Sequence, residues 1–191
     1  MSKLIVSLLA SAGIALAGAA GAAPIAKDAF NAEKDRIEAT YKKDKEACGS
    51  LSGNAKDVCV EQAKAKEKIA KADNEAAYKD TEAARIDARI ARAEANYEVA
   101  KEKCDDLKGN DKDVCVKEAK AAETKAKADA RVAKASADPD RTAAAKQAVR
   151  QDAAEDKRDA EYKVAVEKCD ALAGTAKDNC VRDAKTRFGK T

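Results

Sequence analysis

The sequence predicts an all-α protein of three disulfide-stapled antiparallel helical hairpins in an elongated bundle or coiled-coil-like array. Composition is the first indication. Ala, Glu, Lys and Arg dominate the 191 residues, and Leu, Ile, Val and Phe make up only about an eighth of residues 23–191, which is typical of long helices. An internal repeat is the second indication, and the regular pairs of cysteines within it are the third. So little large apolar surface excludes an enclosed α/β enzyme core.

Residues 1–22 are expected to be a signal peptide. Lys3 gives a positive start, an apolar run follows over residues 4–17, and Ala20-Gly21-Ala22 offers an A-x-A cleavage site. An uncleaved anchor is the alternative, and lipid attachment is disfavoured because Ala19 stands where the acylated cysteine would be. We therefore expect a periplasmic or secreted protein with no stable membrane insertion after cleavage, in a compartment where disulfides persist.

Three segments of the remaining chain align without gaps, at residues 41–64, 97–120 and 162–185. Each contains the pattern Y-x6-C-x2-L-x-G-[NT]-x-K-D-x-C-V, and the copies begin 56 and then 65 residues apart. A duplicated supersecondary unit explains agreement of this detail. The chain is accordingly divided into hairpin 1 (23–80), hairpin 2 (81–138) and hairpin 3 (139–191).

Each copy is expected to form two helices joined by a tight bend. A glycine stands where the first helix must stop, and glycine tolerates the left-handed position at a helix end. A capping residue follows it directly, with an acidic residue three positions later. The glycines are Gly53, Gly109 and Gly174, and the predicted caps are Asn54, Asn110 and Thr175.

These start and stop patterns predict six helices, near residues 26–51, 55–79, 82–107, 111–137, 139–172 and 176–187. Asp138-Pro139 predicts the start of the fifth helix, since proline favours the first helical position. Asp80-Thr81 is a weaker break before the third. One continuous helix from about 55 to 107 is the alternative, because this stretch contains neither Gly nor Pro.

The cysteines support the hairpins. In each copy one Cys lies five residues before the glycine and the other five residues after the predicted cap. Two antiparallel helices would bring both side chains to the same level, although six cysteines allow fifteen pairings in general. The predicted bridges are Cys48–Cys59, Cys104–Cys115 and Cys169–Cys180.

The few large apolar side chains recur at fixed motif positions. Residues 23–191 contain three leucines, one in each bend: Leu51, Leu107 and Leu172. We expect each to pack beneath the bend against the disulfide, with an exposed partner-binding contact as the alternative. Three tyrosines, Tyr41, Tyr97 and Tyr162, each precede a cysteine by seven residues and are expected in the core rather than in a ligand site.

Charge and side-chain chemistry exclude several function classes. The 38 basic and 35 acidic residues give a net charge of +3, spread evenly along the helices, which disfavours nucleic-acid binding. Without histidine there is no Ser/His or Cys/His catalytic pair. C-x10-C is not a chelating spacing, so only reduced thiolates could bind Cu(I) or zinc. We expect no enzyme activity, no cofactor and no metal.

The motif resembles that of uncharacterised exported Ala/Lys-rich helical proteins of Gram-negative bacteria, some of them labelled TolA-like or cell envelope. The resemblance is carried by segments such as Tyr97–Cys104 and Gly109–Cys115 and covers nearly all of residues 23–191. The chain departs from TolA itself in lacking an uncleaved anchor, a glycine linker and a globular C-terminal domain. It is also similar to the twin C-x9-C hairpin, but each helix here contributes one cysteine and the spacing is ten.

Two function classes are consistent with these observations. The first is a non-enzymatic periplasmic or cell-envelope structural or interaction protein. The second is a periplasmic chaperone or envelope-stress binding protein, which would need an exposed apolar or strongly charged concave face. The sequence identifies no envelope partner and leaves oligomerisation open.

Overall fold

The computed structural model describes residues 24–190, so the predicted signal peptide (1–22) lies outside the described residues. This part of the chain contains six α-helices and no strand, which confirms the predicted all-α fold. The helices are α1 (Lys27–Ala47), α2 (Gly53–Lys79), α3 (Glu82–Lys103), α4 (Gly109–Ala137), α5 (Ala143–Cys169) and α6 (Gly174–Phe188), with 3-10 turns at Cys48–Ser50 and Cys104–Asp106.

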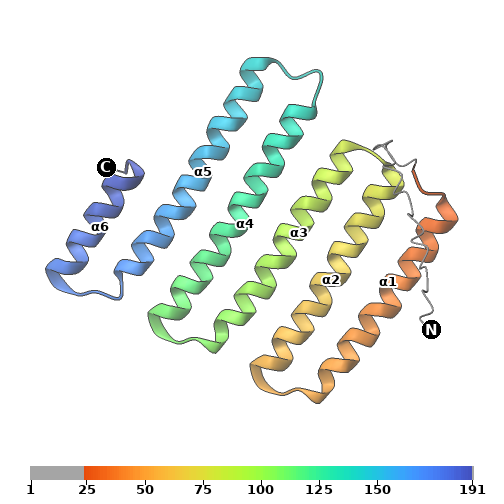
Figure 1. Cartoon of the computed structure of the whole chain (residues 1–191), viewed down its shortest axis with the longest axis horizontal. Coiled ribbons are helices and arrows are strands. Elements are labelled where there is room, and N and C mark those ends of the chain that lie inside the picture. Colours follow the sequence, from red (N-terminus) through yellow and green to blue (C-terminus); the bar gives the residue numbers. More distant parts are fainter. Residues whose placement is uncertain (1–23, 191) are drawn as a thin grey trace, which may run out of the picture.

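The six helices lie side by side in one layer and alternate in direction (Figure 1). Extensive contacts join only helices that are neighbours in the sequence, including α2 with α3 and α4 with α5. The bends of the three hairpins therefore lie along one edge of the layer, which we call the tip edge. The two turns that connect successive hairpins lie along the opposite edge.

The interior between the helices consists mainly of alanine. Of the fully buried side chains, the largest are Ile86 and one cysteine of each bridge, Cys48, Cys104 and Cys169. Alanine lets helix axes approach closely but removes little apolar area from water. Because the contacts between neighbouring helices bury little apolar area, other interactions must contribute a large share of the free energy of unfolding.

Charged side chains connect the middle helices across the layer. Glu94 of α3 accepts from Lys68 of α2 at 2.7 Å and lies 2.6 Å from the Nζ of Lys127 of α4. Lys127 and Lys120 also bind the buried Glu123. Hydrogen bonds from Lys127 and Lys68 lower the pKa of Glu94. Burial acts to raise the pKa of Glu123, but its two lysine hydrogen bonds outweigh that effect and the pKa is lowered.

The connection between α2 and α3 is a break and not a continuous helix. Asp80 adopts a left-handed conformation with φ of 47° at the end of α2, and the side chain of Thr81 accepts a hydrogen bond from the backbone N–H of Ala84. Such a cap satisfies a free amide of the new helix. The break at Asp80-Thr81 is thus confirmed, and the single long helix is excluded.

The connection between α4 and α5 differs from the prediction. Asp138 does not cap a helix starting at residue 139. Its Oδ1 accepts from the backbone N–H of Asp140 in a local turn, and α5 begins at Ala143 with Thr142 as its cap. The reason is that aspartate side chains stabilise turns as readily as helix starts, and Thr142, four residues after Asp138, supplies a competing cap.

Candidate functional site: the tip edge

Each tip is closed by the predicted disulfide. Cys48–Cys59, Cys104–Cys115 and Cys169–Cys180 are bonded, each with a Cα–Cα separation of 5.7 Å. The described residues contain no free cysteine. Pairing within each copy, as the repeat predicted, is confirmed.

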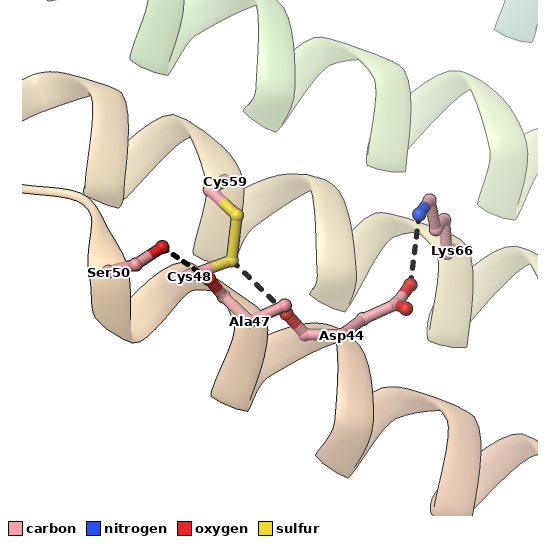
Figure 2. The surroundings of a disulfide bond; sticks show 6 residues. All are labelled: Asp44, Ala47, Cys48, Ser50, Cys59 and Lys66. Atoms are coloured by element: carbon pink, nitrogen blue, oxygen red, sulfur yellow. Dashed lines mark hydrogen bonds and ion pairs between the residues drawn. A yellow bond between two sulfur atoms is a disulfide. The ribbon is translucent and has the colours of Figure 1, made fainter.

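The surroundings of the bridges are also repeated. The Sγ of Cys48 lies against the carbonyl oxygen of Asp44 (Figure 2), and the two atoms are 3.2 Å apart. The same distance separates the Sγ of Cys104 from the carbonyl oxygen of Ala100, and the Sγ of Cys169 from that of Ala165. A sulfur in a disulfide carries no proton, so these are sulfur–oxygen contacts and not hydrogen bonds. The equal sulfur–oxygen distances show that each copy of the repeat builds the same kind of tip.

After the first cysteine the chain makes a one-turn bend. The backbone N–H of each tip leucine donates to the carbonyl of that cysteine, at 3.1, 3.0 and 2.9 Å in the successive tips. Two residues later the glycine has a φ of 57°, 55° or 54°. The left-handed glycine predicted at the bend is therefore present, and a Cβ built there would meet nothing within 4 Å. Backbone conformation and not space requires glycine.

The capping prediction at the bend was wrong in its details. The second helix begins at the glycine itself, one residue before the predicted cap. At the described starts of α2, α4 and α6, the preceding residue makes no side-chain capping bond, and Nδ2 of Asn54 is buried without a partner. Each of these helix starts follows a disulfide-closed bend, so the side-chain cap is not needed for the reversal.

An ion pair supports two of the three tips. Lys112 lies 2.9 Å from Asp105, and the equivalent Lys177 lies 2.9 Å from Asp170. The hydrogen bond with Asp105 raises the pKa of Lys112. Gly49 stands at the equivalent position of the first tip, so that tip lacks the carboxylate. The tips thus share their backbone and differ in charge.

The tip leucines are exposed, which overturns the expectation that they fill the space beneath the bends. Leu51 and Leu107 are each 42% exposed and Leu172 is 44% exposed. The extended backbone of Leu51 and Leu107, with ψ of 165° and 168°, follows the 3-10 turn. The disulfide already occupies the space between the helices, since one sulfur of each bridge is fully buried. The repeat identifies the leucines, but it does not reveal which way they face.

The tyrosines are half-buried on the cysteine side of their helices. Tyr97 lies under the ammonium group of Lys120, with 4.8 Å between Nζ and the ring centre. Tyr162 packs edge-on against Phe188, with ring centres 6.1 Å apart. These contacts are structural, in agreement with the expected packing role, although none of the three rings is fully enclosed.

Two open grooves of about 560 Å³ lie where one hairpin meets the next. The first lies between α2 and α3 and the second between α4 and α5. Their walls use repeat-equivalent residues: Ala65 and Ala121, Val99 and Val164, Ala100 and Ala165, and Lys103 and Lys168. Sequence reasoning missed these grooves, because they depend on how separate hairpins pack.

Metal-ligating side chains are not brought together in residues 24–190. No group of three or more Cys, Asp or Glu side chains there could coordinate a metal ion. None of the helices of this part is long and apolar enough to cross a membrane. What the tip edge offers chemically is a set of exposed leucines, acidic side chains and shallow grooves, which suits binding of another macromolecular surface.

Comparison with protein-family models, with curated proteins and with solved structures found no significant match for this chain.

Proposed function

We propose that the protein is a non-enzymatic structural or interaction protein of the periplasm or cell envelope, which uses its tip edge to contact other proteins. The observation that carries this proposal is the repeated exposure of Leu51, Leu107 and Leu172 along one edge of the layer. A single exposed leucine is ordinary on a protein surface, but three equivalent leucines along one edge form a repeated apolar feature, and covering it would remove apolar area from water.

The disulfides support the proposed location. Three bridges indicate an oxidising environment, and export of the chain would supply it. Within a disulfide-closed bend each leucine is held at a defined position, so little conformational freedom is lost on binding. This preorganisation favours an interaction role over that of a simple spacer.

A pull-down from envelope extract of the producing cell tests the proposal. The bait is the oxidised protein lacking residues 1–22, and its matched control carries L51S, L107S and L172S, which leaves helices and bridges unchanged. Proteins captured by the first bait and lost with the second support the proposal. Equal capture by both baits, or by neither, contradicts it.

The chaperone alternative is distinguished by a separate assay. A chaperone should suppress aggregation of unrelated unfolded proteins at stoichiometric concentration. Among residues 24–190 the large apolar side chains that are exposed are Tyr78 and the three tip leucines, which is a small surface for holding unfolded clients. We therefore expect no suppression.

A further inference from the structure

The leucines and the junction grooves follow the same period. Neighbouring tips are separated by two helices, and so are the two grooves, because both features are built from equivalent residues of the repeat. Each groove runs along the last two turns before the disulfide of the following hairpin, from Asn96 to Lys103 in α3 and from Glu161 to Lys168 in α5. Tips and grooves therefore alternate along the same side of the layer.

The grooves are apolar at their base. Ala65, Ile69 and Val99 line the first, and Ala121, Val164 and Phe188 line the second. Each groove has a volume of about 560 Å³, which is larger than a leucine side chain. Burying a tip leucine there would remove from water both the apolar surface of the leucine and that of the groove.

The charges of tips and grooves are complementary. The middle tip (104–113) carries four Asp and two Lys, the third tip (169–178) two Asp and one Lys, and the first tip (48–57) one of each. The first groove is lined by Lys66 and Lys103 with no acidic residue. The second has three basic and two acidic residues, and both acids are paired, Glu118 with Lys168 and Glu161 with Lys125. Two of the three tips are therefore acidic and the first is neutral. Lys66 already binds Asp44 at 2.9 Å, so the basic groups that would face an acidic tip are Lys103 in the first groove and Arg187 in the second.

We infer that the tip edge binds a second copy of this chain, with the leucine tips of one copy seated in the junction grooves of the other. The inference rests on the proposed interaction function and names its partner. A two-fold axis normal to the layer would place the same edge of both copies face to face, as in most homodimers. The stepped outline of the edge in Figure 1 is compatible with this axis, because a half-turn in the plane superimposes a sloping line on itself.

The experiment measures sedimentation of the oxidised chain without residues 1–22 at protein concentrations from about 1 µM to 1 mM. A dissociation constant above about 1 mM would be too weak for a specific dimer. We expect a reversible dimer that salt weakens, because the charge contacts are exposed. The tip variant L51S/L107S/L172S and the groove variant V99E/V164E should each raise the dissociation constant at least about 100-fold. A second groove variant, K103E/K168E, changes exposed lysines and leaves the half-buried valines in place. It tests the grooves without a substitution in the packing between helices.

A mixture gives the sharpest result. The tip variant has intact grooves and the groove variant has intact tips, so together they can form half of the interface. We expect a heterodimer in the mixture at concentrations at which each variant alone is monomeric. The control K27E/K42E makes the same change of charge on α1, outside the grooves, and should dimerise like the unmodified chain.

Three results overturn the inference. They are a monomer throughout the concentration range, a dimer unaffected by the tip variant, and no heterodimer in the mixture. A monomer that still captures a different envelope protein through its leucines overturns self-association and leaves the proposed interaction function standing. Failure of both experiments removes both proposals.

Discussion

Removing the middle disulfide tests what holds the layer together. Replacing Cys104 and Cys115 by Ala opens a loop whose ends are 11 residues apart. In the loop-entropy account such a bridge contributes about 3 kcal/mol by restricting the unfolded chain. For a chain of this length each kcal/mol corresponds to about 2–4 °C, so the melting temperature should fall by about 6–12 °C.

The matched control is Leu107→Ala in the same tip. Leu107 is 42% exposed, and substitutions at such exposed positions change stability by about 0.5 kcal/mol or less, a shift of about 2 °C. The double cysteine variant should therefore melt well below the leucine variant. Full reduction of all three bridges should lower the melting temperature much further while leaving helical signal in the cold, since helix propensity survives reduction.

Circular-dichroism melting of the oxidised, reduced, C104A/C115A and L107A proteins makes the comparison. Superimposable curves for the oxidised and reduced proteins would refute the reasoning, because they would mean that the alanine seams supply the stability without the bridges. A large loss for L107A would contradict the exposed position of the leucine.

Three further predictions follow from particular residues. Gly109→Ala should cost about 1–2 kcal/mol in denaturant unfolding because φ is 55° there, whereas Gly49→Ala, equally free of close neighbours but not at a positive φ, should leave stability nearly unchanged. Hydrogen bonds from Lys127 and Lys68 lower the pKa of Glu94 below its ordinary value of 4.5. The ionised Glu94 therefore contributes its full stabilisation above about pH 4.5, and this is lost as the pH falls through the lowered pKa of the folded protein. In melts recorded against pH, E94Q should reduce the loss of stability on the acid side. The exported protein should begin near Ala23 on N-terminal sequencing, and a mature form that retains residues 4–17 would contradict the proposed export.

The local features could be predicted from the sequence because each depends on residues close together in the chain. The number of helices, the bridges and the break at Asp80-Thr81 all come from short-range patterns. The start of α5 was misplaced because Asp138 and Thr142 are both competent caps, and only the path of the turn selects between them.

The tip edge could be predicted only in part. Equal spacing identified Leu51, Leu107 and Leu172 as equivalent, but it did not show whether leucine or sulfur fills the space between the two helices. The structure shows that sulfur does. The grooves could not be predicted at all, since Val99 and Ala65 are on different hairpins and meet only when α2 packs on α3.

The two edges of the layer are built differently, and this difference favours binding at the tips. Every bend on the tip edge is covalently closed. The opposite edge depends on the Thr81 and Thr142 caps and on exposed ion pairs such as Arg85 with Asp80, each worth about 1 kcal/mol or less. Local opening should therefore begin at the inter-hairpin turns and spare the tips. Leucines presented from the more rigid edge stay in register with one another, which is what a repeated set of contacts to a second surface requires.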